Sequence, residues 1–134
     1  MQDIINSIKA HEGYEPMVYK CTEGHDTIGI GFKVADLKLS EEVCDLIMAE
    51  ILDDLISRIE RKISWFRYTE DEVKLVIVNM SYQMGLSGVL KFKRALAAME
   101  IKNWGMAADE MLDSLWARQT PNRANELADI IRGL

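Results

Sequence analysis

Three residues near the amino terminus have types and spacing that suit hydrolytic chemistry. Eight residues separate Glu12 from Cys21, and five separate Cys21 from Thr27. A carboxyl group can protonate a leaving oxygen, while a thiol or hydroxyl can hold, deprotonate or replace an attacking water. A carboxylate at the C-terminal end of a helix meets the negative end of the helix dipole, which favours its protonated form. Glu12 is therefore a candidate acid, and Cys21 and Thr27 are candidate water-handling groups.

The elements that must position these side chains are a helix and a hairpin. A stripe of isoleucines predicts a helix over residues 1–12, which ends at Gly13 because glycine commonly terminates helices. Residues 17–20 and 27–31 are predicted strands around a turn at residues 22–25. The candidate acid should thus lie just before a hairpin that carries the thiol and the hydroxyl.

The remainder of the chain is predicted to be helical. Apolar residues spaced by four predict a long helix at residues 40–63, capped by Ser40. Capping-box spacing at residues 69–72 opens a helix that should stop near Gly85. Three further helices have Ser87, Asn103 and Thr120 as predicted caps, the last with Pro121 at its first position. The pattern predicts an α+β chain that is predominantly helical.

Composition narrows the function classes. The 134 residues, 49% of them hydrophobic, suit one domain with a real core. No stretch approaches the roughly 18 apolar residues of a membrane span, and the amino terminus lacks a basic leader, so we expect neither an export signal nor stable membrane association. The net charge of −6 disfavours binding to nucleic acid and to anionic lipid.

Cysteine and histidine usage indicates no metal or cofactor. The spacings of His11, Cys21, His25 and Cys44 fit no zinc pattern. We expect both cysteines to be free thiols, because a chain without an export signal stays in a reducing compartment. Cys44 lies in an apolar helical pattern, which predicts a small core residue.

Three segments carry a resemblance to a known family. The segment from Glu12 to Gly31 ends in T-I-G-I-G, residues 79–85 read N-M-S-Y-Q-M-G, and residues 116–123 read W-A-R-Q-T-P-N-R. In this order they resemble the phage lysozymes, glycoside hydrolase family 24. The resemblance covers almost the whole chain except residues 33–68, where the T-even type has a longer β-rich insertion that this chain has trimmed.

The resemblance implies a lysozyme-like, two-lobed α+β fold. A small β-hairpin lobe at about residues 13–39 would be followed by a connecting helix at about 40–63. A helical lobe at about 64–134 would be joined by helix 1–12, and the whole would form one domain.

It also implies an endolysin that hydrolyses the β-1,4 bond between N-acetylmuramic acid and N-acetylglucosamine in peptidoglycan. Glu12 would donate the proton and Arg123 would pair with Glu12. Cys21 stands where the T-even proteins have Asp, so its role as base, nucleophile or water-orienting group stays open; Thr27 would hold the water, which favours inversion. The alternative is a catalytically weakened peptidoglycan-binding or interaction protein on the same scaffold.

Further positions map in or beside the saccharide cleft of the family. Gln83 is expected to bind an N-acetyl sugar, because a polar amide within an apolar helix needs a partner. For Trp116, stacking on a sugar and packing in the core both stay open. The remaining mapped positions are Met84, Phe92 and Asn122.

The same resemblance sets expectations for partners and location. We expect a monomer that binds the peptidoglycan glycan strand and needs no cofactor. It would be made in the host cytoplasm without a signal peptide and would act in the periplasm or cell wall after release by a holin, a phage pore protein.

Overall fold

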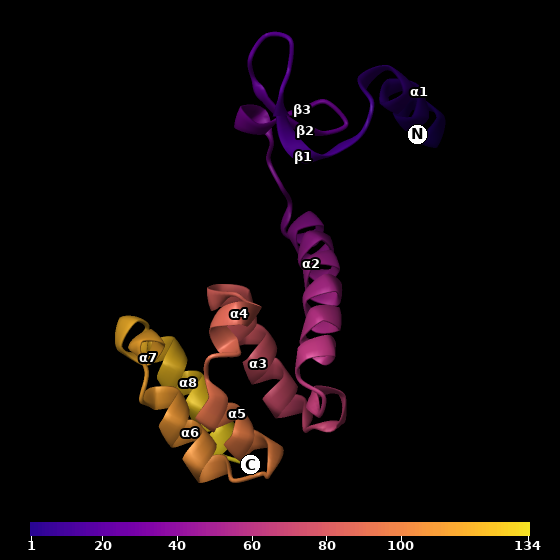
Figure 1. Ribbon diagram of the computed structural model, residues 1–134. Helices are drawn as coiled ribbons and strands as arrows, with labels where there is room; N and C mark the ends of the chain where they lie inside the picture. Colours follow the sequence, from indigo (N-terminus) through magenta and orange to yellow (C-terminus); the bar gives the residue numbers. More distant parts are fainter. The chain divides into compact units, whose positions relative to one another are not determined.

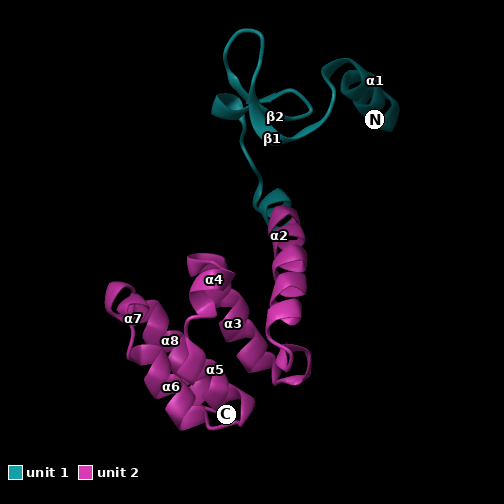
Figure 2. Cartoon of the chain, in the orientation of Figure 1, with its two compact units in different colours: residues 1–45 teal, residues 46–134 magenta.

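The computed structural model, which describes residues 1–134, is predominantly helical and has one small antiparallel sheet (Figure 1). This confirms the predicted α+β class. The chain divides into a hairpin unit, residues 1–45, and a helical unit, residues 46–134 (Figure 2). No helix is both long enough and apolar enough to cross a membrane. The predicted joining of helix 1–12 to the helical lobe stays a prediction.

The hairpin unit begins with α1 (Gln2–Glu12), followed by β1 (Glu15–Lys20), β2 (Asp26–Gly29) and β3 (Phe32–Lys33). The predicted helix and its end are confirmed: Gly13 has φ 75° and its N–H donates to the Lys9 carbonyl. The predicted second strand, residues 27–31, is wrong in extent. Gly29 and Gly31 have φ of 70° and 69°, which turns the chain back into a third strand.

The sheet order is β1-β2-β3, so β2 is the central strand. Thr27 on β2 faces Tyr19 on β1 and Lys33 on β3. Its side chain is only 5% exposed, and it is the only buried residue of the hairpin unit. Backbone pairing, more than an apolar core, therefore holds this unit together. A short 3-10 helix, η1 (Val34–Asp36), follows the sheet.

The long predicted helix is confirmed within one residue as α2 (Glu41–Lys62). Ser40 accepts a hydrogen bond from the Val43 N–H at 3.2 Å, as predicted for its cap. The buried side chains of α2, Leu55 and Ile59, lie in its second half. Cys44 lies near the start of the helix and is exposed, so the prediction that it is a core residue is wrong. Both cysteines are free thiols.

The helical unit contains the rest of α2 and seven further short elements. In chain order these are η2 (Phe66–Tyr68), α3 (Asp71–Met84), α4 (Leu86–Val89), α5 (Lys93–Glu100), α6 (Trp104–Leu112), α7 (Leu115–Gln119) and α8 (Pro121–Arg132). Of the predicted caps, Asn103 is confirmed, since it accepts from the Met106 N–H at 3.3 Å. Ser87 lies inside α4 and caps nothing. Thr120 precedes α8, yet its hydroxyl donates to the Trp116 carbonyl.

The start of α3 differs from the predicted capping box. The N-cap is Glu70, with no side-chain capping bond, and the Thr69 hydroxyl donates to the Glu70 carboxylate at 3.1 Å. Lys102 pairs with the same carboxylate at 2.7 Å. The Glu70 carboxylate thus has Thr69 and Lys102 as side-chain partners, and the local capping pattern did not predict either contact.

The core of the helical unit lies where α3, α5, α6 and α8 meet. Alanines recur among the buried residues of α5, α6 and α8, which lets their helix axes approach closely. Ile77, Met80 and Val76 of α3 are almost fully buried. The amphipathic helices of the sequence thereby bury one continuous apolar face.

The α3 helix should contribute strongly to stability. Ile77 is 0% exposed, so Ile77→Ala should lower the free energy of unfolding by about 2–5 kcal/mol through lost packing and a residual cavity. Ile101 is 73% exposed, and Ile101→Ala should change it by less than about 1 kcal/mol. Chemical denaturation of both variants measures this difference. Equal losses would contradict the described core.

Candidate active site

The turn between β1 and β2 brings Cys21 and Thr27 together. Tyr19 pairs with Thr27, and since side chains alternate along a strand, Cys21 projects on the same side of the sheet as Thr27. The backbone of His25 joins the two residues. Its N–H donates to the Cys21 sulfur at 3.4 Å, and its carbonyl accepts from the Thr27 hydroxyl at 2.9 Å. The spacing seen in the sequence thus corresponds to one local cluster.

The electrostatics of this cluster favour a thiolate. Backbone N–H groups of His25, foremost, and of Glu23 lower the pKa of the Cys21 thiol, and the Thr27 hydroxyl acts in the same direction when it turns toward the sulfur. Partial burial and the Glu23 carboxylate oppose this shift. Because a thiolate is the reactive form of cysteine, Cys21 is available as a base or nucleophile at a lower pH than an ordinary thiol.

Glu12, the last residue of α1, lies against the loop between β2 and β3. A Cβ atom placed on Gly31 would come within 2.7 Å of the Glu12 Oε2 atom and 3.1 Å of its Cδ atom. The absence of a side chain at Gly31 therefore leaves space for the Glu12 carboxyl group, and glycine also adopts the positive φ of this turn readily. Our sequence reasoning did not assign this role to Gly31, although the T-I-G-I-G segment contains it.

Arg123 lies in the first turn of α8 and is held by α3. Its Nε atom donates to the Asn79 Oδ1 atom at 2.8 Å, and its Nη2 atom donates to the Asn79 carbonyl at 3.3 Å. The side chain is half-buried, and no carboxylate of the helical unit forms an ion pair with it. Asn79 is a positioning residue that sequence reasoning missed; its place at the start of N-M-S-Y-Q-M-G was the available signal.

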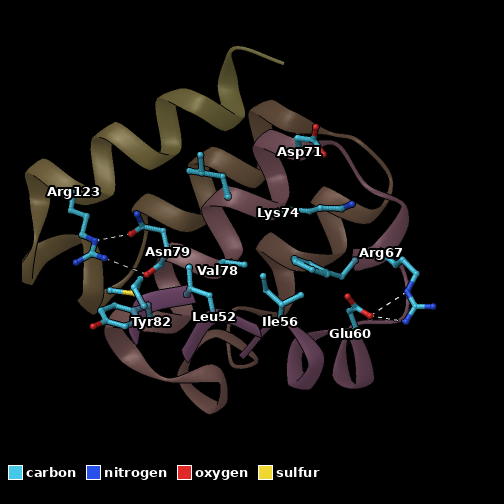
Figure 3. A pocket seen from close by; sticks show the side chains of 13 residues that line it. Leu52, Ile56, Glu60, Arg67, Asp71, Lys74, Val78, Asn79, Tyr82 and Arg123 are labelled. Carbon is cyan, nitrogen blue, oxygen red and sulfur yellow. Dashed lines mark hydrogen bonds and ion pairs between the residues drawn. The ribbon is translucent and has the colours of Figure 1, made fainter. Parts of the chain in front are cut away.

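The Arg123 guanidinium lies at one end of a cavity of about 610 Å³ within the helical unit (Figure 3). Figure 3 shows Asn79 and Tyr82 beside Arg123, and the Glu60–Arg67 ion pair near the opposite end. Between these ends α2, η2 and α3 supply a mainly apolar lining. The apolar members are Met48, Leu52, Ile56, Phe66, Leu75 and Val78.

Trp116 is 8% exposed and belongs to the core of the helical unit. Its indole N–H donates to the Gln83 Oε1 atom at 2.8 Å, and its ring meets Phe92 edge-on with centroids 6.0 Å apart. Of the two roles predicted for Trp116, the structure therefore favours packing in the core over stacking on a sugar. Gln83 is exposed; its oxygen is satisfied by Trp116, while its amide nitrogen has no protein partner.

The remaining mapped residues lie nearby on the same unit. Met84 is half-buried and packs near Gly88, where an added Cβ would come 3.1 Å from the Met84 Cγ atom. Asn122 is exposed in the first turn of α8, next to Arg123. No group of three or more His, Cys, Asp and Glu side chains is arranged to hold a metal ion.

Comparisons with known proteins agree on one family. The family model described as Phage lysozyme matches residues 9–129. "Probable T4-type lysozyme 1" of Dictyostelium discoideum is 30% identical over 98% of this chain and 94% of its own length. "Probable T4-type lysozyme 2" of the same organism is 31% identical over 92% and 89%. The "Pre-baseplate central spike protein Gp5" of Enterobacteria phage T4 is 28% identical over 92% of this chain and 26% of its own length.

The chain therefore belongs to the phage lysozyme family, which confirms the resemblance seen in its sequence. It is a lysozyme-like protein, and membership of this family supports a glycoside hydrolase.

The contact between Gly31 and Glu12 can be measured as a coupling energy. Gly31→Ala should destabilise the protein by roughly 1–3 kcal/mol, because it combines positive φ with a collision against the Glu12 carboxyl group. In a Glu12→Ala background the collision is relieved and the loss should be smaller. Thermal unfolding of wild type, both single variants and the double variant measures this. Strictly additive losses would mean that Glu12 does not lie against Gly31.

Proposed function

We propose that this protein is an endolysin that hydrolyses the β-1,4 bond between N-acetylmuramic acid and N-acetylglucosamine in bacterial peptidoglycan, with Glu12, Cys21 and Thr27 as its catalytic residues. The observation that carries the proposal is the cluster in the hairpin unit. The backbone of His25 joins Cys21 and Thr27, through its N–H and its carbonyl respectively, and the Glu12 carboxyl group lies against the loop that follows β2. A chain of the phage lysozyme family thus has an acid and two water-handling groups on one small scaffold.

In the proposed reaction Glu12 donates its proton to the leaving glycosidic oxygen as the bond from that oxygen to the anomeric carbon breaks. A water on the opposite face of the sugar attacks the anomeric carbon. Thr27 accepts a hydrogen bond from this water, while its own proton is directed to the His25 carbonyl. The Cys21 thiolate takes the proton that the water loses. The anomeric configuration is inverted, and solvent returns the proton to Glu12 and removes it from Cys21.

Arg123 is proposed to set the proton affinity of Glu12. Arg123 is half-buried with no carboxylate partner in its own unit, although a partly buried cation favours an anionic neighbour. We propose, from the resemblance to the phage lysozyme family, that Glu12 pairs with Arg123 and that the chain forms one lysozyme-like domain.

Substrate binding is proposed to involve the exposed amides near Arg123. The free amide nitrogen of Gln83 can donate to the acetamido oxygen of a sugar, and Asn122 offers a second amide. Trp116 and Phe92 act indirectly, since the edge-on ring pair fixes the indole that orients Gln83. Met84 completes the apolar support behind this surface.

The biological setting is part of the proposal. The protein would be a monomer made in the host cytoplasm. It would reach the glycan strand in the periplasm or cell wall only after a holin opens the inner membrane, and it would cause host lysis without a cofactor.

The first test replaces the proposed acid. Glu12→Gln keeps the size of the side chain but cannot supply the proton, so lysis in a cell-wall turbidity assay should fall by about 100-fold or more. Glu15→Gln, at an exposed glutamate on β1, is the matched control and should lyse normally. Wild-type lysis by Glu12→Gln would refute the proposed acid. Binding to walls without lysis by any version would instead support the alternative of a peptidoglycan-binding protein in which the change to Cys21 ended catalysis.

The second test concerns stereochemistry. Attack by a water held near Thr27 and Cys21 predicts that the first product released from a β-linked chitooligosaccharide or wall fragment is the α-anomer. Proton NMR of early reaction mixtures distinguishes the two anomers before they equilibrate. A β-anomer as first product would contradict inversion and would indicate a two-step, retaining reaction.

A further inference from the structure

The backbone N–H and carbonyl of His25 contact both proposed water-handling residues. Its N–H donates to the Cys21 sulfur at 3.4 Å. The His25 carbonyl accepts from the Cys21 N–H and from the Thr27 hydroxyl, each at 2.9 Å. One residue of the turn therefore fixes the backbone of Cys21, orients its sulfur and directs the proton of Thr27.

Gly24 is what allows this arrangement. The turn is closed by the Gly24 N–H, which donates to the Cys21 carbonyl at 2.9 Å. Gly24 then takes φ 81°, a conformation that bulky L-residues avoid, and so reverses the chain before His25. An added Cβ would meet nothing within 4 Å. The requirement for glycine here is conformational, since no neighbour competes for the space.

We infer that Gly24 and the backbone N–H of His25 are positioning groups for the reaction, which aim a fixed hydrogen-bond donor at the Cys21 sulfur and thereby hold it as an anionic base beside the Thr27 hydroxyl. This inference rests on the proposed function. It assigns the Cys21 thiol the role that the Asp carboxylate has in the T-even proteins. A thiol is a weaker acid than Asp, but the His25 N–H is already oriented toward the sulfur and stabilises the thiolate without reorganisation.

The charged groups around the turn do not supply this effect. The Glu23 carboxylate raises the pKa of the Cys21 thiol, against the shift produced by the N–H donors. The His25 imidazole lies 3.7 Å from the same carboxylate, so its ring faces Glu23. Lys20 and Asp26, on either side of the turn, form an ion pair at 2.7 Å and largely cancel. Because the Thr27 hydroxyl donates to the His25 carbonyl, the backbone donors are the groups that favour the thiolate in this arrangement.

The inference predicts how Cys21 responds to pH and to changes in the turn. The alkylation rate by iodoacetamide reports the thiolate fraction and requires no lytic activity. In Cys44→Ser, Cys21 is the sole thiol; in Cys21→Ser, the exposed Cys44 provides a reference from the same chain. Cys21 should become reactive at lower pH than Cys44. If the two thiols respond to pH alike in these folded proteins, the inference is wrong.

Two pairs of variants in the Cys44→Ser background identify the donor. His25→Ala keeps the backbone N–H and should alkylate like its parent, whereas His25→Pro lacks it and should react about fivefold more slowly at pH 7. Gly24→Val should also slow the reaction about fivefold, because a β-branched residue resists positive φ, and Gly24→Asn should restore most of the rate, because Asn tolerates it. Circular dichroism confirms folding, and the His25 pair decides the question if a Gly24 variant unfolds.

Lysis measured across pH connects the turn to the reaction. The acidic limb of the activity profile should move to higher pH in His25→Pro and Gly24→Val, and should stay in place in His25→Ala. Equal alkylation rates in all four variants would overturn the inference while leaving a Glu12-dependent endolysin intact. The expected alkylation pattern without lysis by any version would sustain the effect of the turn on Cys21 and overturn the proposed function.

Discussion

The hydrogen bond from the Thr27 hydroxyl to the His25 carbonyl is the interaction on which the rest of the candidate site depends. It connects the turn that holds Cys21 to the one buried side chain of the hairpin unit. Without an apolar core, this unit can keep a precise geometry only through hydrogen bonds and restricted backbone angles. Thr27 supplies a hydrogen bond and the glycines supply the restricted backbone angles. Thr27 thus connects the stability of the sheet to the position of the Cys21 sulfur.

Glycines determine where the hairpin unit changes direction. Four glycines of this unit have positive φ and lie where the chain turns between α1, β1, β2 and β3: Gly13, Gly24, Gly29 and Gly31. At Gly31 a second constraint appears, because the Glu12 carboxyl group occupies the space where a side chain would project. Gly31 is therefore required for two reasons, its positive φ and its close contact with Glu12, in a segment whose sequence otherwise resembles an ordinary strand.

In the helical unit, hydrogen bonds from two side chains join the two sequence motifs. Trp116 donates to Gln83 across 33 positions of the chain, and Arg123 donates to Asn79 across 44. Both donors come from W-A-R-Q-T-P-N-R and both acceptors from N-M-S-Y-Q-M-G. The motifs are thus two halves of one structural feature, in which α3 orients the side chains that α7 and α8 carry.

Much of this protein could be predicted from local pattern. The α+β class, the end of α1 at Gly13, the span of α2 and the Asn103 cap follow from periodicity and from side chains that act within a few residues. The closeness of Cys21 and Thr27 belongs here too, because a short turn and strand alternation leave few other arrangements. The family itself could be recognised from the three motif segments.

Other features were decided only by tertiary structure. The third strand, the exposure of Cys44, the burial of Trp116, the partner of Gln83 and the Asn79–Arg123 contact depend on which distant residues meet. Thr69 and Ser87 are residue types that commonly cap helices, yet the Thr69 hydroxyl donates to Glu70 and Ser87 lies inside α4. Local propensities differ by about 1 kcal/mol or less, while burial of a side chain or a buried polar group without a partner weighs more, so packing overrules the local preference wherever the two conflict.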